Sequence, residues 1–285
     1  MKIAISGSSG FIGKHLGAFF SRQGDTVVPL KHAYFKMSSD DVLKDALSGC
    51  DVVINLAGAT INQRWTKVAK RKIMNSRVQT TRRLVSIVND MPLKPSLFIS
   101  ISAVGIYPSD GIYNESSSQE GSGFLADVCK KWEEEAQKLS TDIRLVIARL
   151  GVVLASDGGA LPFMLLPFRF FAGGKIASGK QGFSWIHIED LMSAMQFVIT
   201  HKELSGIINF VSPQPVTNRV FTEAAAAALH RPAWFVVPKF VFRLLYGEGE
   251  VLATEGQKAF PARLQSAGYA FLYPDIRIAL QSLVV

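Results

Sequence analysis

The chain opens with Lys2-Ile3-Ala4-Ile5-Ser6-Gly7-Ser8-Ser9-Gly10-Phe11-Ile12-Gly13, and this stretch decides the fold. Its apolar run predicts a buried strand, which three regularly spaced glycines follow. One glycine lets the chain turn sharply, the next lets the main chain approach a pyrophosphate, and the last lets a helix pack against the sheet. The helix N-terminus then favours phosphates through unpaired N–H groups and its dipole. Because the spacing is G-x-x-G-x-x-G rather than the general G-x-G-x-x-G, the surrounding sequence has to support the motif.

The residues after the glycines provide that support. Apolar side chains recur at helical spacing from Phe11 to Phe20, and Gly24-Asp25 predicts the end of a helix. A second apolar run, Thr26–Leu30, follows directly. Strand, turn, helix and strand thus fit within about 30 residues, which is the context that a dinucleotide-binding turn requires.

The same alternation continues through the first half of the chain. We predict strands at residues 52–56, 97–101 and 145–148, with helices at 66–89 and 124–139 between them. Such alternation builds parallel βαβ units, and strands this apolar are buried on both faces. The expected fold is α/β, a Rossmann-like doubly wound parallel sheet with a smaller, mostly helical C-terminal substrate region.

The pattern loosens beyond Gly151 into longer loops, with one more strand near 207–211 and a helix near 217–229. The chain reads as helical from Pro238. We expect residues 1–237 to form the dinucleotide-binding domain, including substrate-cleft insertions from about residue 155. Residues 238–285 would form a helical module of unknown function.

Composition and charge restrict the class of protein. Hydrophobic residues make up 48% of the 285 positions and charged residues 19%, which is typical of a globular chain. No apolar stretch is long and uncharged enough to predict a membrane span, and the chain enters a strand too early for a signal peptide. Two cysteines, Cys50 and Cys129, argue against a disulfide framework, so we expect a cytoplasmic protein.

A formal net charge of +8 raises the question of a nucleic-acid partner. The one dense basic segment, Lys67–Lys72, carries no interleaved aromatic residues for base stacking. We therefore expect no nucleic-acid partner and assign the excess charge to ligand phosphates and a solvated helix face. Five scattered histidines show no metal-ligand spacing, so no metal site is expected.

Further motifs extend from end to end of the chain. Besides the glycines, they are Asn55-Leu56-Ala57-Gly58, Arg64-Trp65-Thr66, Ser76-Arg77-Val78, Ser100-Ile101-Ser102-Ala103-Val104, Lys131-Trp132-Glu133, Gly151-Val152-Val153-Leu154, Gly158-Gly159-Ala160, Ser184-Trp185-Ile186-His187-Ile188-Glu189-Asp190-Leu191 and Pro215-Val216-Thr217-Asn218. With these motifs the chain resembles the extended short-chain dehydrogenase/reductases, and more closely the nucleoside-diphosphate-sugar epimerase-like branch of the NAD-dependent epimerase/dehydratase family. The resemblance implies oxidoreductase or epimerase chemistry on a small molecule and, by analogy with relatives, a possible homodimer.

The end of the second strand indicates which dinucleotide is bound. An acidic residue there would accept hydrogen bonds from the ribose of NAD, whereas a cation accommodates the extra phosphate of NADP. This chain offers Lys31 and His32 and no carboxylate, so we expect NADP(H). The alternative is that Lys31 and His32 are simply exposed at the end of a strand and bind no phosphate. The cofactor-binding residues expected from the turn and the resemblance are Gly7, Ser9, Gly10, Phe11, Ile12, Gly13, Lys31, His32, Leu56, Ala57, Gly58, Arg77, Ser100 and Val152.

The acid–base residues of the resembled family are incomplete. Active members pair a serine, matched here by Ser102, with Tyr-x-x-x-Lys on the next helix, whose tyrosine exchanges a proton with substrate. The segment Gly123–Glu133 contains no tyrosine. Two alignments place the missing pair either at Leu125 and Cys129 or at Asp127 and Lys131.

Other side chains compete for the missing role. Ser102 and Ser100 stand at a strand end, where a hydroxyl can polarise a substrate carbonyl or simply bond to backbone. Tyr107 and Tyr113 in the following loop are further candidates, and Ser102 with Tyr107 forms the expected catalytic set. We interpret His187 as a packing histidine and Cys129 as a small buried hydrophobe.

The apolar stretches Leu161–Phe171 and Trp234–Val237 favour core packing, with an apolar substrate or a partner surface as alternatives.

Three functions follow for the whole chain. The first is an NADP(H)-dependent oxidoreductase or epimerase with altered proton transfer. The second is a non-catalytic sensor of the nucleotide's redox state, and the third is a dimerising scaffold that keeps the cofactor for stability.

Overall fold

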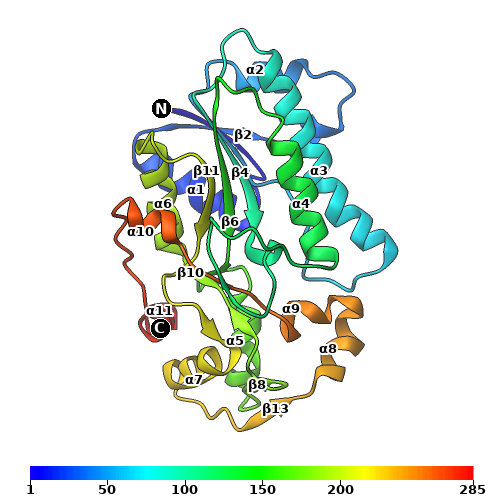
Figure 1. Ribbon diagram of the computed structural model, residues 1–285, viewed down its shortest axis with the longest axis vertical. Helices are drawn as coiled ribbons and strands as arrows, with labels where there is room; N and C mark the ends of the chain where they lie inside the picture. The colour runs from blue at the N-terminus through cyan, green and yellow to red at the C-terminus, as the bar shows by residue number, and fades with distance from the viewer. Residues whose placement is uncertain (285) are drawn as a thin grey trace.

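The computed structural model in Figure 1 describes residues 1–284 and is built around one parallel six-stranded sheet. The expected Rossmann-like α/β architecture is confirmed. Each strand is a short apolar run, and in every strand of the sheet except the edge strand β2 most side chains are buried. In spatial order the strands are β11 (Gly206–Phe210), β6 (Arg144–Leu150), β4 (Leu97–Ala103), β3 (Val52–Asn55), β1 (Lys2–Ser6) and β2 (Thr26–Leu30).

Helices cover both faces of the sheet (Figure 1). On one face, Ile3 and Ile5 of β1 pack with side chains of α1 and α6, whereas Ala4 faces a second cluster with Leu84 of α3. This alternation follows from the two-residue period of a strand, and it makes the sheet doubly wound. The covering helices are α1 (Phe11–Arg22), α2 (Asp41–Leu47), α3 (Lys67–Asp90), α4 (Phe124–Ala136) and α6 (Ile188–Thr200).

The strand order reverses at β1, which pairs with β2 on one side and β3 on the other. Ser6 lies opposite Leu30 of β2 and Asn55 of β3. The chain therefore leaves all three strands at the same level. Open α/β sheets bind ligands in the crevice outside the carboxyl ends of strands at such a reversal.

The second half adds short strand pairs and a third hydrophobic cluster around Trp185, Phe221 and Leu280. The strand pairs are β7 (Val152–Leu154) with β10 (Trp185–His187), β9 (Gly182–Phe183) with β12 (Val216–Thr217), β8 (Gly174–Ile176) with β13 (Phe235–Val237), and β5 (Ile112–Tyr113) with β14 (Lys258–Ala259). The remaining helices are α5 (Leu161–Arg169), α7 (Asn218–Leu229), α8 (Lys239–Tyr246), α9 (Val251–Thr254), α10 (Ala262–Ser266) and α11 (Ile276–Leu283), with 3-10 turns η1 (His32–Lys36), η2 (Val104–Ile106) and η3 (Glu248–Glu250).

The C-terminal residues are joined to the rest of the fold. Lys258 and Ala259 pair in parallel with Ile112 and Tyr113. Arg263 also donates a hydrogen bond to the carbonyl of Ile207, 2.9 Å away, on the edge strand β11. Within residues 1–284, no helix combines the length and apolar character needed to cross a membrane.

Candidate functional site

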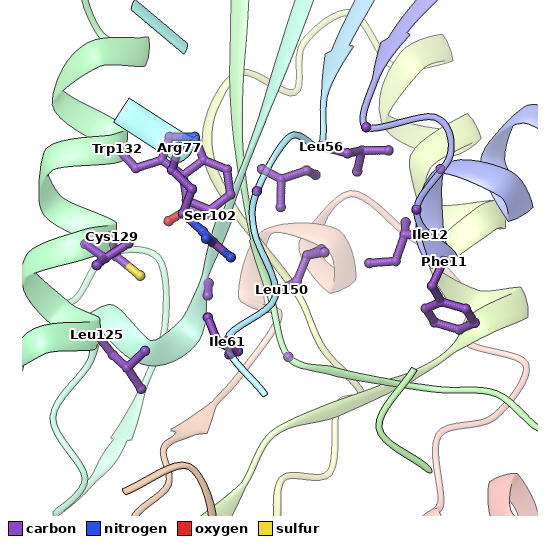
Figure 2. Close-up of a pocket in the computed structure, with 18 residues that line it drawn as sticks. Phe11, Ile12, Leu56, Ile61, Arg77, Ser102, Leu125, Cys129, Trp132 and Leu150 are labelled. Atoms are coloured by element: carbon purple, nitrogen blue, oxygen red, sulfur yellow. The ribbon is translucent and has the colours of Figure 1, made fainter. Parts of the chain in front are cut away.

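A cleft of about 380 Å³ opens at the switch point, between the start of α1 and the inner face of α4 (Figure 2). The loops after β1, β3, β4 and β6 form its floor, as the reversal of strand order requires. The residues that line it are Gly7, Gly10, Phe11, Ile12, Gly13, Leu56, Gly58, Ile61, Arg77, Ile101, Ser102, Ala103, Leu125, Val128, Cys129, Trp132, Leu150 and Gly151.

Two glycines in the first turn are required by geometry. Gly7 has φ of +69°, and a Cβ there would lie 3.0 Å from the backbone of Leu56. A Cβ on Gly13 would lie 2.3 Å from the carbonyl oxygen of Gly7. The Gly10 amide donates to that same oxygen at 2.9 Å, which closes the turn. Side chains at these positions would fill the cradle, so the turn presents bare main chain to the cleft.

The start of α1 is open to an anion. Its N-cap residue, Gly10, has no side chain to accept the first N–H groups, and the first turn contains no acidic residue. The N–H groups of the first turn and the helix dipole therefore favour a negatively charged group in the cleft. The Phe11 ring packs beside the Gly158-Gly159 loop, where an added Cβ would approach it within 2.8 Å.

Arg77 brings a positive charge to the cleft from α3. Its Nη1 donates to the carbonyl oxygens of Ala59 at 3.0 Å and Ile73 at 3.1 Å. Its guanidinium carbon lies 5.2 Å from the centroid of the Trp132 ring. No carboxylate within residues 1–284 forms a salt bridge with it. Burial lowers the pKa of Arg77. The fixed guanidinium is suited to a phosphate oxygen entering the cleft.

Lys31 and His32 lie outside the cleft wall but level with its glycine turn, because β2 ends in register with β1. Both side chains are exposed, and among the described residues neither takes part in a salt bridge or a side-chain hydrogen bond.

Four other expected cofactor residues lie off the wall of the cleft. Ser9 is exposed at the turn, and Ser100 is buried within β4. Val152 follows the lining residue Gly151. The Ala57 amide donates to the Ser6 hydroxyl at 3.2 Å, which fixes the loop after β3.

Ser102 is the one hydroxyl side chain among the lining residues. Its Oγ donates to Glu133 Oε1 at 2.6 Å. Arg149 holds the same carboxylate with two hydrogen bonds, Nε to Oε1 at 2.9 Å and Nη2 to Oε2 at 2.7 Å. All three side chains are buried. Glu133 belongs to the motif Lys131-Trp132-Glu133, but the sequence indicates no role for it, because only the fold brings β4, α4 and β6 together.

The inner face of α4 decides between the two alignments of the missing Tyr-x-x-x-Lys pair. Leu125 and Cys129 line the cleft one helical turn apart (Figure 2). Asp127 and Lys131, by contrast, are exposed. Burial raises the pKa of the Cys129 thiol to about 11. The lining contains no tyrosine, histidine, lysine or carboxylate side chain.

The structure places the other acid–base candidates away from the cleft. Tyr107 is 1% exposed, and its hydroxyl donates to Asn209 Oδ1 at 3.0 Å. Its ring stacks on Tyr113, 5.8 Å away between centroids. Tyr107 was expected in the catalytic set. The structure buries this hydroxyl, bonds it to Asn209 and leaves it off the cleft wall.

His187 has a packing role. It caps α6 by accepting the Glu189 amide at Nδ1, 3.1 Å away, and its ring lies 3.8 Å from that of Tyr273. Burial lowers the pKa of His187 to about 4. The imidazole therefore stays neutral at physiological pH. His187 also does not belong to the residues that line the cleft.

A buried hydrogen-bond network fixes the floor of the cleft beneath the glycine turn. Ser6 Oγ donates to Asn55 Oδ1 at 2.7 Å, and Asn55 Nδ2 donates to Thr81 Oγ1 at 2.7 Å. The Trp132 indole donates to the same Thr81 oxygen at 2.8 Å. The network links β1, β3, α3 and α4, so the elements that carry the lining residues are held in one geometry. Nothing in the local sequence signals it.

Residues 3–210 match the NAD dependent epimerase/dehydratase family. The chain belongs to this family. Residues 237–283 match a domain of unknown function (DUF1731).

Two curated relatives within the epimerase family are similar over the whole of this chain. An epimerase family protein SDR39U1 homolog, chloroplastic, from Arabidopsis thaliana is 34% identical, over 100% of this chain and 87% of the relative. Epimerase family protein YfhF from Bacillus subtilis is 36% identical, over 100% of this chain and 98% of the relative.

Solved structures of the epimerase family share the fold. Human epimerase family protein SDR39U1 (isoform 2), solved with NADPH, has a TM-score of 0.92 and 32% identity, covering 100% of this chain and 99% of that chain. A UDP-glucuronic acid 4-epimerase from Bacillus cereus has a TM-score of 0.77 at 17% identity, covering 100% of this chain and 98% of that chain. At that identity the likeness establishes the fold alone.

Proposed function

We propose that this chain binds NADP(H) in the cleft and acts as an oxidoreductase or epimerase-like protein on a small molecule. The bare glycine turn and the uncapped start of α1 lie on one side of the cleft, and the half-buried cation Arg77 lies across from them, so both sides suit an anion. The human structure with NADPH, which this chain matches over its full length, supports the same ligand.

Each part of the cofactor has residues suited to it. The first turn of α1 and Arg77 would hold the pyrophosphate, and Lys31 with His32 would meet the extra ribose phosphate. The main chain at Leu56, Ala57 and Gly58 would border the adenosine half, with Ser9, Ser100 and Val152 as further positions proposed from the sequence. When bound, the nicotinamide supplies hydride exchange with a substrate carbon.

Among the side chains that line the cleft, Ser102 is the one hydroxyl that can contact a substrate. Its proton is already donated to Glu133, so toward the cleft it offers lone pairs. It is therefore placed to accept a hydrogen bond from a substrate hydroxyl and orient that group.

The observation that carries the cofactor assignment is the pair Lys31 and His32 at the level of the glycine turn, without a neighbouring carboxylate. Calorimetry of NADPH and NADH on the wild type and on a Lys31→Ala/His32→Ala variant tests it. NADPH binding should weaken about tenfold or more, the effect of losing a charge-assisted phosphate contact, with NADH little changed. Lys36→Ala, an exposed cation at the end of η1, is the matched control. Equal weakening of both nucleotides would overturn the phosphate assignment.

The apolar face of α4 favours a second candidate, a sensor of nucleotide redox state without turnover. Leu125 and Cys129 occupy the positions where an acid–base pair would reach the cleft. Absorbance of NADPH, followed while carbonyl compounds and nucleotide sugars are added to the protein, separates the two functions. Consumption of NADPH supports the enzyme, and tight binding without consumption of any compound supports the sensor.

We further propose that residues 1–237 form the dinucleotide-binding domain and residues 238–285 a C-terminal module. The pairing of β14 with β5 supports a module that is joined to the first domain. A chain ending at residue 237 should therefore lose stability rather than behave as an independent unit, which thermal unfolding would measure.

A further inference from the structure

The elements α5, β13 and α8 lie toward the end of the molecule opposite α2 (Figure 1), and each of them carries large apolar side chains that are exposed. We call this surface the apolar end. On α5 and the turn after it, Phe163, Phe170 and Phe171 are all more than half exposed. Beside them, β13 pairs with β8 and presents Phe235 and the preceding Trp234, which is 84% exposed. For the stretches Leu161–Phe171 and Trp234–Val237 the sequence favoured packing in the core. That interpretation is correct only for the buried face of α5, which carries Leu161, Leu165 and Phe168.

The helix α8 continues the apolar end. Phe240 and Leu244 lie one turn apart and are 68% and 72% exposed, with Leu245 beside them. No residue of α8 is buried. The helix is nevertheless anchored, because Arg64 Nη1 donates to the Leu244 carbonyl at 2.6 Å. An anchored helix that turns its apolar face to solvent indicates a binding surface rather than packing within its own chain.

The segments that form the apolar end carry an excess of positive charge, with Glu223 of α7 and the η3 carboxylates at its margin. Residues 158–188 contain three lysines and arginines and no carboxylate, and residues 224–247 contain three more and again no carboxylate. Two of these cations, Lys239 and Arg243, lie on α8 itself. The nearby η3 carboxylates Glu248 and Glu250 are in salt bridges with Lys70 and Lys239. A partner that fits must therefore offer an apolar interior and a negatively charged rim.

We propose that the apolar end docks on the surface of a lipid bilayer that contains anionic headgroups. Exposed phenylalanines and a tryptophan suit the boundary between headgroups and acyl chains, and lysines and arginines around them suit anionic lipid. A second copy of this chain fits less well. A two-fold interface would bring the same surface of each copy together, and with it six cations against six.

The test uses the full chain and the protein's own fluorescence. Trp234 is exposed, whereas Trp65, Trp132 and Trp185 are buried, so a shift on lipid addition reports the apolar end. Vesicles of phosphatidylcholine alone are compared with vesicles that also contain phosphatidylglycerol. We expect sedimentation with the anionic vesicles, a blue shift of Trp234 emission, and loss of binding at high salt.

Three variants locate the contact. Phe240→Ser/Leu244→Ser should weaken vesicle binding at least about tenfold, and Lys239→Gln/Arg243→Gln should weaken it several-fold and reduce its salt dependence. Leu93→Ser removes an equally exposed leucine between α3 and β4 and should change nothing. Circular dichroism checks that each variant is folded.

Several results would overturn the proposal. These are no sedimentation with either vesicle, or binding that the Phe240→Ser/Leu244→Ser variant leaves intact. Self-association without lipid that this variant abolishes would instead assign the surface to a second copy. Capture of a protein partner, with no shift of Trp234 emission on vesicles, would assign it to that partner.

Discussion

Glu133 accepts the hydroxyl proton of Ser102, with 2.6 Å between Oε1 and Oγ, and this bond fixes how the serine faces the cleft. A hydroxyl has one proton, and a carboxylate can only accept it. Ser102 therefore presents lone pairs to a ligand, which suits a hydroxyl or amide donor better than a carbonyl. The sequence left two roles open for Ser102, polarising a substrate carbonyl or bonding to neighbouring backbone.

Replacing Glu133 should be costly for stability. Glu133→Ala would leave the buried Arg149 guanidinium without its carboxylate, and breaking a buried ion pair in this way costs about 3–5 kcal/mol. Urea unfolding would measure the loss. Glu134→Ala, a change at the exposed neighbouring position, should cost less than about 0.5 kcal/mol. Similar costs for the two variants would show that the pair contributes little.

A methyl group at Gly13 should damage the cradle. The Cβ of Gly13→Ala would lie 2.3 Å from Gly7 O and 2.7 Å from Ser8 Cα, so the turn must move. We expect NADPH binding to weaken about tenfold or more, as the N–H groups lose their alignment. Gly17→Ala is the control on the same helix, because its Cβ would meet only Val27 at 3.9 Å. That variant should bind normally and gain about 0.5–1 kcal/mol of stability. Normal NADPH binding by Gly13→Ala would contradict the proposal that this glycine turn holds the nucleotide.

Arg77 should contribute to binding without distinguishing NADPH from NADH. Arg77→Gln removes a half-buried cation from the cleft wall, and losing a charged hydrogen bond to phosphate costs about 1.5–3 kcal/mol. Both nucleotides share the pyrophosphate, so calorimetry should show both weakened by a similar factor. Arg71→Gln, on the exposed face of α3, should have no effect. A loss of affinity confined to NADPH would indicate that Arg77 contacts the extra ribose phosphate instead of the pyrophosphate.

His187 should make stability depend on pH. Its pKa is about 4 in the folded protein against about 6.5 when unfolded, so the unfolded chain binds more protons between these values. Stability is therefore fully present above pH 6.5 and falls as the pH drops toward 4, by about 3 kcal/mol. Urea unfolding across this range would measure it. His187→Asn keeps a side-chain acceptor for the Glu189 amide and should flatten the curve. An unchanged slope would assign the dependence to other groups.

The amino-acid sequence determined the sheet, its helices and the dinucleotide-binding turn. These are set by local patterns: an apolar run, glycines whose missing side chains make room, and the helical spacing from Phe11 to Phe20. The position of Ser102 at a strand end followed from the same alternation. Each of these features depends on residues close together in the chain, which is why they could be predicted.

Tertiary structure alone decided what faces the cleft. The sequence left Leu125 or Asp127 open on α4, and packing against the sheet turned Leu125 inward. The fold buries Tyr107 and bonds its hydroxyl to Asn209, away from the cleft wall. It also brings Ser102 of β4 within hydrogen-bond distance of Glu133 of α4. Such contacts join residues far apart in the chain. They are selected by how a whole helix buries its apolar face, and no local pattern records that choice.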